Sequence, residues 1–544
     1  MMLTLKKLSK KPVIAMTAIA VAVLLAYGNS LRGGFVFDDQ FILADAPIHR
    51  DAGLRNWFPP HYYQVAGERS YRPVTTLSYV AQSKIESMFT EAAAHPGPVF
   101  SPVFYRGANV ALHFGVACGL WLLARCWLGS GFALFASLLF AVYPVTAETV
   151  NVTGFREELL VALFALGAMM LFRRWCRAPG GPTALILAAA GVLLAGLSKE
   201  TGYVMPLVLG LTAAAELGPW NRRMWLGGAF LFALGALGGL VCIVLLQNRV
   251  IVHHAWLADY HGARWPLIGP LLSTHLRILL APYPLIADRT FLAAEAGSAE
   301  VMALVTILLG VVLAAGALWA WMRNKTVFVG LVWMLVPLAP VMGFMPLPNP
   351  VAERYYYVPA LGAALLWGAV AQQAWQRMSA FRWRAALFLV AGAVVLSGGV
   401  ALTVQRNADW SSEAGLWMVT LRQNPRSIKA NENIGYLLMH KGRPARALPY
   451  LRRAIRLDPF DSRLQENLAV ALAMTGDIDA GIKVAEGAIR DDLVQPSLFM
   501  NLCAMWMNRR DPSVEQALTY YRCGLASGAT RNPEMEKRLG LQNK

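Results

Sequence analysis

Long apolar segments, which follow one another from residue 13 to residue 405, constrain the fold of this chain more than any other feature. Of its 544 residues, 56% are hydrophobic and only 15% are charged. Soluble domains carry about 25% charged residues, so this composition excludes an ordinary soluble protein. Residues 406–544 contain no comparable apolar runs. The sequence therefore predicts an all-α protein, in which a membrane-embedded helical bundle (residues 1–405) precedes a helical domain outside the cytoplasm (residues 406–544).

Eleven apolar stretches are expected to span the membrane, although several are shorter than the roughly 20 residues that a bilayer requires. They are residues 13–27, 106–124, 130–146, 158–173, 183–198, 202–217, 224–246, 300–322, 326–344, 355–374 and 384–404. Four lysines precede the first stretch, which has the layout of a secretory signal peptide but which we interpret as an uncleaved anchor. An apolar stretch at residues 266–285 contains four prolines and is expected to lie at the outer face.

Basic residues fix the expected orientation of the chain. The net charge is +17, and Lys and Arg gather at alternate ends of the apolar stretches. This pattern is typical of cytoplasmic turns rather than of nucleic-acid binding. The basic turns carry Arg125, Arg173, Arg174, Arg177, Arg222, Arg223, Arg323, Lys325, Arg377, Arg382 and Arg384. The N-terminus is therefore predicted to be cytoplasmic and the tail extracytoplasmic, with three long outer loops at residues 29–105, 147–157 and 247–299.

The tail contains a repeat with a period of 34 residues. Residues 428–461 and 462–495 align in register, and a third copy with a small insertion covers residues 496–529. Small and apolar residues recur at the positions of a tetratricopeptide repeat (TPR), in which two helices pack closely and successive repeats stack. The third repeat is expected to carry Cys503 and Cys523 on its two helices, either bridged by a disulfide or as two unbridged small core residues.

Charged motifs lie at the outer loops and at the outer ends of the expected spans. In chain order they are Phe35-Val36-Phe37-Asp38-Asp39, Ser70-Tyr71-Arg72-Pro73, Pro144-Val145-Thr146-Ala147-Glu148, Gly154-Phe155-Arg156-Glu157-Glu158, Ser198-Lys199-Glu200 and Ala352-Glu353-Arg354. Carboxylates beside several fixed cations suit a reaction that needs a general base and a clamp for phosphate.

The order of these motifs, with Arg406-Asn407-Ala408-Asp409-Trp410-Ser411-Ser412-Glu413 leading into the repeats, resembles the transmembrane and tetratricopeptide-repeat O-mannosyltransferases of the GT-C superfamily. The resemblance covers essentially the whole chain. It implies a multi-span enzyme that moves a hexose, mannose in that family, from a polyprenyl-phosphate carrier to Ser or Thr of an acceptor protein at the outer face. The repeats would bind the acceptor peptide. The short tail and plain anchor suggest a bacterial inner-membrane member, and the histidine usual in the family is replaced here by Val145-Thr146.

The resemblance also implies roles for individual residues. Asp38 is the expected general base, with Asp39 as its neighbour or as a ligand to the acceptor or a divalent cation; two carboxylates are too few to assign a metal site. The expected ligands of the donor phosphate are Lys199 and Arg156, followed by Arg354 and Arg72. Glu148 and Glu353 are further site candidates.

Two other features receive structural interpretations. His113 is interpreted as a hydrogen-bonded histidine within the membrane, and Tyr355–Tyr357 as an interfacial aromatic belt. The chain has no glycine-rich phosphate loop and no dinucleotide-binding fingerprint, which fits a lipid-linked donor. Two other functions stay open: the same donor chemistry with a lipid or polysaccharide acceptor, and a non-catalytic repeat scaffold that the membrane part merely anchors.

Overall fold

The computed structural model describes residues 12–39, 72–89, 101–177, 182–218, 221–246, 268–289, 299–342, 349–491 and 495–541. These residues form helices joined by short connections, without a strand among them, which confirms the predicted all-α class. Contacts divide them into two compact units. The membrane unit comprises the described residues up to Gly415, except Asp288 and Arg289. The tail unit comprises those two residues and everything described from Leu416 onward.

Six helices of the described chain are long and apolar enough to cross a membrane, so the protein is a multi-pass membrane protein. They are Pro12–Arg32 (α2 with η1), Pro102–Ala124 (α5), Thr153–Arg177 (η7 with α8), Arg222–Val241 (in α11, Arg222–Leu246), Glu300–Arg323 (in α14, Ala299–Arg323) and Arg384–Asp409 (α17). A bent pair, Ser130–Ala141 (α6) and Pro144–Asn151 (η6 with α7), turns by 46° at its break and would be a seventh span.

The other four expected spans also fold as helices. α9 (Thr183–Ser198), α10 (Met205–Leu217) and α15 (Lys325–Leu335) have 16, 13 and 11 residues, and α16 (Tyr357–Arg377) has 21. At a rise of about 1.5 Å per residue, the three shorter helices cannot cross a hydrocarbon layer of about 30 Å unaided. The total of eleven spans therefore stays a prediction.

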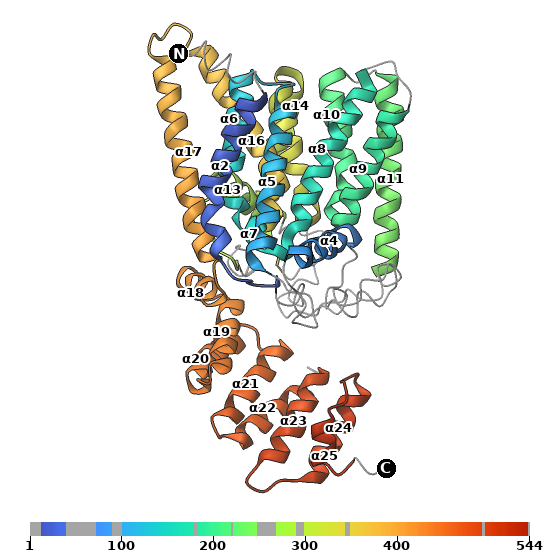
Figure 1. Ribbon diagram of the computed structural model, residues 1–544, viewed down its shortest axis with the longest axis vertical. Coiled ribbons are helices and arrows are strands. Elements are labelled where there is room, and N and C mark those ends of the chain that lie inside the picture. Colours follow the sequence, from blue (N-terminus) through green and yellow to red (C-terminus); the bar gives the residue numbers. More distant parts are fainter. Residues whose placement is uncertain are drawn as a thin grey trace. The chain divides into compact units, whose positions relative to one another are not determined.

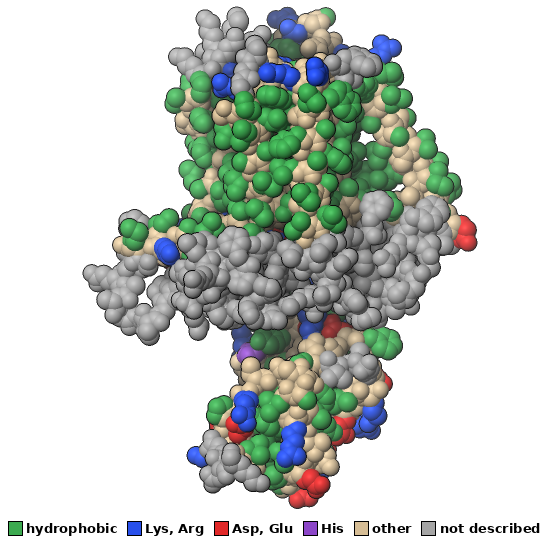
Figure 2. All heavy atoms as spheres, turned by 90° about the vertical axis from the view of Figure 1, so that its right-hand side faces the viewer, with side chains coloured by type: hydrophobic (Ala, Val, Ile, Leu, Met, Phe, Trp, Pro, Cys, Tyr) green, Lys and Arg blue, Asp and Glu red, His purple; other side chains and the backbone are tan. Residues whose placement is uncertain are grey.

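The membrane unit buries one side of many helices and exposes apolar surface elsewhere. Figure 1 shows its long helices running side by side, and α8 packs against both α5 and α9. The apolar windows of α14 and α17 are only 6% and 0% buried. Figure 2 shows a hydrophobic band with Lys and Arg side chains gathered at its upper edge. Such a band, edged by basic residues, fits the acyl region of a bilayer.

The stretch expected at the outer face contains α13 (Ile268–Leu280), a helix of 13 residues that packs against α14 and α16. Its length of about 20 Å is too short for a complete crossing. His275, near its middle, is fully buried and its Nδ1 lies 2.8 Å from the Tyr356 hydroxyl. Because α10, an expected span, has the same length, the prediction that residues 266–285 lie at the outer face without spanning stays a prediction.

The tail unit is a series of helix pairs. They are α19 (Ile428–His440) with α20 (Pro444–Leu457), α21 (Ser462–Met474) with α22 (Ile478–Arg490), and α23 (Pro496–Asn508) with α24 (Val514–Ala526). The first helices of the pairs begin 34 residues apart, at residues 428, 462 and 496. α18 (Glu413–Gln423) precedes the pairs and α25 (Pro533–Arg538) follows them. Cys503 and Cys523 lie on α23 and α24 as expected, and both are free thiols, the first buried and the second exposed.

Candidate active site

The turn that carries the two aspartates follows the first membrane helix. Phe37 adopts a left-handed conformation with φ 59°, which for a bulky side chain costs about 1–2 kcal/mol. Asp39 is fully buried, and its carboxylate accepts hydrogen bonds from the backbone N–H groups of Gly154 (2.8 Å) and Val36 (3.2 Å). Asp38 is half-buried. The turn thus separates the two carboxylates, with Asp39 anchored in the protein and Asp38 left nearer the surface.

Burial changes the acidity of the anchored carboxyl. It raises the pKa of Asp39 from its ordinary value of 3.8 to about 7, because desolvation outweighs the hydrogen bonds from Gly154 and Val36. The Arg106 guanidinium partly offsets this rise, and the neighbouring Asp38 adds to it.

Arg354 links the aspartate turn to the segment that contains Glu148. Its Nη1 lies 2.9 Å from one Glu148 carboxylate oxygen, and its backbone N–H donates to the other oxygen, also at 2.9 Å. The guanidinium lies over the rings of Phe155 (4.7 Å) and Tyr355 (5.1 Å). Burial alone would lower the pKa of Arg354, but electrostatic interactions with Tyr355, Glu148 and Asp38 raise it. Arg354 therefore stays charged beside Asp38.

Lys199 is the centre of a buried ion-pair network. Its Nζ donates to Glu157 (2.9 Å) and to Glu158 (2.7 Å), and Arg72 joins Glu157 (2.6 Å) to Glu200 (3.0 Å). Burial disfavours the charged Lys199, but the two carboxylates outweigh this effect and raise its pKa. The network brings together three of the predicted motifs: Arg72 just before α4 (Pro73–Phe89), the glutamates at the start of α8, and Lys199 between α9 and η8 (Glu200–Val204).

Arg156 has different surroundings from its neighbours in sequence. Its guanidinium donates to Asn109 Oδ1 (2.9 Å), Ser78 Oγ (3.3 Å) and the Tyr105 carbonyl (3.3 Å), and it lies 4.7 Å from the centre of the Tyr79 ring. None of the ion pairs between described residues includes it. Arg156 therefore joins α4, α5 and α8, and its expected contact with a donor phosphate stays a prediction.

The Glu353 carboxylate forms an ion pair with Arg406, which was not among the expected site residues. Arg406 Nε and Nη2 bind the two Glu353 oxygens at 3.1 and 2.7 Å, and Arg406 Nη1 binds Asp409 at 3.0 Å. This two-point pair between α17 and η12 (Glu353–Tyr356) fixes the position of the neighbouring Arg354.

Arg106 is the second missed arginine. It is fully buried at the start of α5 and donates to the carbonyls of Ser30 (3.0 Å), Gly34 (2.5 Å) and Trp410 (2.9 Å). A Cβ on Gly33 would lie 2.3 Å from Arg106 Nη1, so any larger residue there would displace the guanidinium from its three carbonyl partners. One signal could have found both arginines: each stands at the expected outer end of a span, where basic residues are scarce.

The aromatic-belt prediction is wrong for Tyr356 and Tyr357, whereas Tyr355 is half-buried. Tyr356 and Tyr357 are fully buried, and their hydroxyls lie 2.8 Å from Nδ1 of His275 and His113, respectively. These tyrosines point into the protein because each finds a buried imidazole partner there. His113 Nε2 also lies 3.2 Å from the Ala141 carbonyl, which confirms that His113 is a hydrogen-bonded buried histidine.

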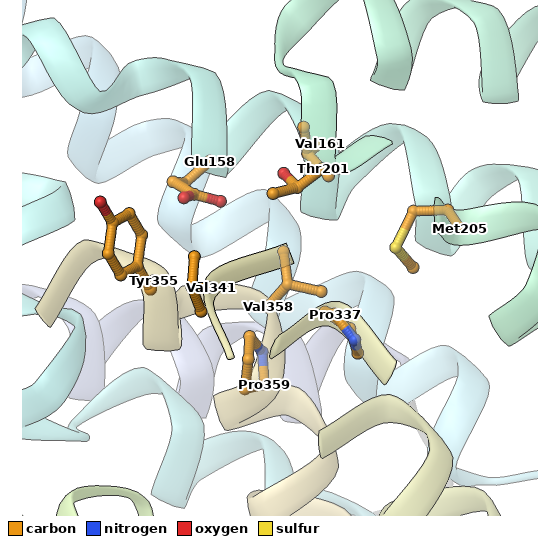
Figure 3. Close-up of a pocket in the computed structure, with 9 residues that line it drawn as sticks. All are labelled: Glu158, Val161, Thr201, Met205, Pro337, Val341, Tyr355, Val358 and Pro359. Atoms are coloured by element: carbon orange, nitrogen blue, oxygen red, sulfur yellow. The ribbon is translucent and has the colours of Figure 1, made fainter. Parts of the chain in front are cut away.

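A small, partly open hollow lies next to the Lys199 network. Its lining is mostly apolar and consists of Glu158, Val161, Thr201, Met205, Pro337, Val341, Tyr355, Val358 and Pro359. Figure 3 shows the Glu158 carboxylate between Tyr355 and Thr201, with the two prolines on the opposite side. The Thr201 hydroxyl is buried and finds no hydrogen-bond partner among the described residues. The hollow thus combines apolar walls with one polar edge, an arrangement that suits an amphipathic ligand.

The described part of the chain does not provide a set of ligands for the expected divalent cation. In that part, no three His, Cys, Asp or Glu side chains are grouped to hold a metal ion. The cation stays a prediction.

Sequence comparison finds several animal relatives. The chain is 26% identical over 490 residues to protein O-mannosyl-transferase TMTC3 of Mus musculus, an alignment that covers 82% of this chain and 51% of the relative. It is 27% identical over 539 residues to Tmtc3 of Drosophila melanogaster (81% and 55% covered) and 25% identical over 533 residues to TMTC1 of Homo sapiens (86% and 58% covered). The chain spans little more than half the length of these curated relatives.

Comparison of the fold finds oligosaccharyltransferases from Archaeoglobus fulgidus. One, solved with zinc and sulfate, has a TM-score of 0.43 and 15% identity, with 72% of this chain and 53% of that chain covered. Another, AglB with an inhibitory peptide and a dolichol-phosphate, has a TM-score of 0.41 and 14% identity. No family model matches the chain. Over about four fifths of its length the chain is similar to protein O-mannosyl-transferases of the TMTC type, which confirms the resemblance inferred from its motifs.

Proposed function

We propose that this protein is a membrane-embedded glycosyltransferase that moves a hexose from a polyprenyl-phosphate carrier to a Ser or Thr hydroxyl of an acceptor protein on the outer face. The observation that carries the proposal is the convergence of motifs from distant parts of the chain. Asp38, Glu148, Lys199 and Arg354 belong to one connected cluster beside the hollow. The named relatives, which are protein O-mannosyl-transferases, support mannose as the hexose and a protein as the acceptor.

Asp38 is the base in this proposal. Its carboxylate takes the proton of the acceptor hydroxyl while the hydroxyl oxygen forms a bond to the anomeric carbon of the sugar. The bond between that carbon and the phosphate oxygen breaks, and the phosphate leaves with the electron pair. Because attack comes from the side opposite the phosphate, the configuration at the anomeric carbon inverts. The half-buried position of Asp38 supports this role, whereas Asp39 already uses both carboxylate oxygens on backbone N–H groups.

Arg354 and Lys199 stabilise the leaving phosphate. Both are held charged by nearby carboxylates and lie within cation–π distance of the Tyr355 ring, at 5.1 and 5.9 Å. Fixed charges in a site with little water stabilise developing negative charge strongly. Arg72 does not contact the phosphate in this proposal; it binds Glu157, which in turn binds Lys199.

The beginning of the polyprenyl chain lies against this hollow. Its apolar walls suit isoprenoid units, and the Glu158 edge is adjacent to Lys199 (2.7 Å). A lipid-linked donor also requires no nucleotide-binding motif. The tail repeats recruit the acceptor, because stacked helix pairs form extended concave surfaces for peptides.

A transfer assay with the full-length protein tests the proposal. Wild type and Asp38→Asn receive radiolabelled polyprenyl-phosphate hexoses, with mannose among them, and label is followed into protein, lipid and polysaccharide fractions. Loss of the base should reduce labelling of protein by about 10²–10⁴-fold. Asp479→Asn, which changes an exposed tail carboxylate, is the matched control and should leave transfer intact. Label in lipid or polysaccharide would contradict the protein acceptor, and equal transfer by Asp38→Asn would remove Asp38 as the base.

A further inference from the structure

The turn that carries Asp38 is held by a residue far away in sequence. The backbone N–H of Phe37 donates to Glu413 Oε1 at 2.6 Å, and the two residues are 376 positions apart. A hydrogen bond of this length to an ionised carboxylate is among the stronger ones in proteins. It acts on the residue whose left-handed conformation sets the direction of the turn, immediately before Asp38.

Neighbours of Glu413 hold the same loop at other points. The Gly34 N–H donates to the Ser411 carbonyl (3.0 Å), and the Phe37 ring lies edge-on to Trp410, with 6.1 Å between ring centres. On the other side of the turn, Asp39 binds the Gly154 N–H. The loop is therefore fixed from two sides, and the bond to Glu413 is made by Phe37, the residue immediately before Asp38.

Helix capping does not account for this orientation of Glu413. Glu413 is the first residue of α18, where a carboxylate is favourable through the helix dipole alone. The N-terminal N–H groups of α18 have another acceptor, since Ser412 Oγ accepts from the Gly415 N–H at 3.2 Å. The Glu413 carboxylate is directed to the Phe37 amide instead.

We propose that Glu413 is a positioning residue for Asp38. Its carboxylate holds Phe37 in the left-handed conformation, and this conformation keeps the Asp38 side chain beside Arg354. Without the acceptor, Phe37 relaxes to a negative φ and Asp38 moves away from the acceptor hydroxyl. The effect of Glu413 on catalysis rests on the proposed function, whereas its effect on the conformation of the turn does not.

Kinetics of the full-length protein test the catalytic consequence. Glu413→Ala should lower kcat by about 10²-fold, the effect of a displacement of about 1 Å, with little change in the KM for the donor. Glu413→Gln, which keeps the acceptor oxygen, should retain most of the activity. Glu515→Ala, which removes the matching first-turn glutamate of α24, should have no effect. Equal losses in the Ala and Gln variants would overturn the proposal.

A double-mutant comparison separates positioning from general damage. In the Asp38→Asn background there is no base to position, so Glu413→Ala should cause no further loss of the residual transfer. A further loss as large as in wild type would show that Glu413 acts elsewhere, and would contradict the proposal.

Hydrogen–deuterium exchange gives a measurement that does not depend on activity. Peptides that cover residues 33–39 should exchange faster in Glu413→Ala than in wild type, Glu413→Gln or Glu515→Ala, while the remaining membrane helices exchange as before. Unchanged exchange in these peptides would overturn the positioning role even if transfer is observed. If, conversely, Glu413→Ala speeds exchange at residues 33–39 although the wild-type protein transfers no hexose, the result supports the role of Glu413 in holding the turn and contradicts only the proposed function.

Discussion

Two adjacent carboxylates at residues 38 and 39 have different environments, and this difference divides their roles. Asp39 is enclosed and bonded to two backbone N–H groups, so it stabilises the turn. Asp38 is half-buried, beside Arg354, and stays accessible to a substrate. The left-handed Phe37 makes this separation, because it reverses the direction of the chain just before the pair.

The raised pKa of Asp39 predicts a pH-dependent stability. The carboxyl ionises near pH 3.8 in the unfolded chain and near pH 7 in the folded protein. Between these values the unfolded state releases its proton first, so the stabilisation that is present below pH 3.8 is lost as the pH rises to about 7. Thermal unfolding in detergent from pH 4 to pH 8 should show this loss in wild type and in Asp479→Asn, but not in Asp39→Asn. Parallel curves for all three proteins would contradict the buried ionisation.

Removing the Lys199 charge should destabilise the membrane unit. Lys199→Met leaves Glu158 without its cation, while Glu157 keeps Arg72. A buried ion pair that loses one partner costs about 3–5 kcal/mol, so the thermal midpoint in detergent should fall clearly. Glu158→Gln added to Lys199→Met should restore part of the loss, because it removes the unpaired charge. If the double variant is less stable than the single one, Glu158 is not the affected partner.

At the scale of single residues, the sequence predicted the charged motifs but not all of their partners. Lys199, Arg354 and Glu148 could be identified because they lie in short polar segments between apolar runs. Arg106 and Arg406 were missed because each is part of a long apolar helix, although their place at the outer end of a span, where basic residues are scarce, was a usable signal. Which cation binds which carboxylate depends on how the helices pack, and spacing along one chain does not determine that packing.

Among the helices, the tail elements depend on small residues at one repeated position. Gly435, Ala469 and Cys503 each occupy the eighth residue of the first helix in a pair. All three are buried, and a Cβ on Gly435 would lie 2.7 Å from the Leu451 side chain on the partner helix. The close approach of α19 and α20 therefore requires a small residue at this position.

A larger residue at this position should loosen the first helix pair. Gly435→Leu forces extra volume into a packed contact, which costs about 1–3 kcal/mol. Exchange of the α19 and α20 amides with deuterium should therefore accelerate. Gly487→Leu, where the nearest group to a Cβ is the Arg490 guanidinium at 3.7 Å, is the control and should exchange as in wild type. If amide exchange accelerates equally in both variants, the cause is the replacement of a glycine as such and not crowding against Leu451.

The sequence predicted some elements better than others for a physical reason. The repeat helices begin 34 residues apart because the same small residues recur at that interval, and a local pattern is sufficient for this prediction. The stretch at residues 130–146 was expected as one span, but the chain turns after Ala141 and continues in short helices to Asn151. Proline at position 144 marks the break, whereas hydropathy alone averages over it.

The orientation of the whole molecule can be tested with its own cysteines. Cys523 is exposed in the tail unit, and Cys126 lies at the turn after α5, among the basic residues expected in the cytoplasm. A membrane-impermeant maleimide applied to intact cells should label Cys523, whereas Cys126 should react only after permeabilisation. Mass spectrometry of the labelled peptides identifies each site, with Cys523→Ser as the control. The reverse pattern of labelling would place the tail in the cytoplasm.

The bond between Phe37 and Glu413 can form only late in the synthesis of the chain. A ribosome that adds about 5–20 residues per second makes Glu413 about 20–75 s after Phe37, because the two are 376 residues apart. Throughout this interval the first membrane helix is complete while the acceptor for the Phe37 amide does not yet exist. The bond that holds the aspartate turn from the Glu413 side therefore forms only after the last helix of the membrane unit has been made, so an unfinished chain lacks it.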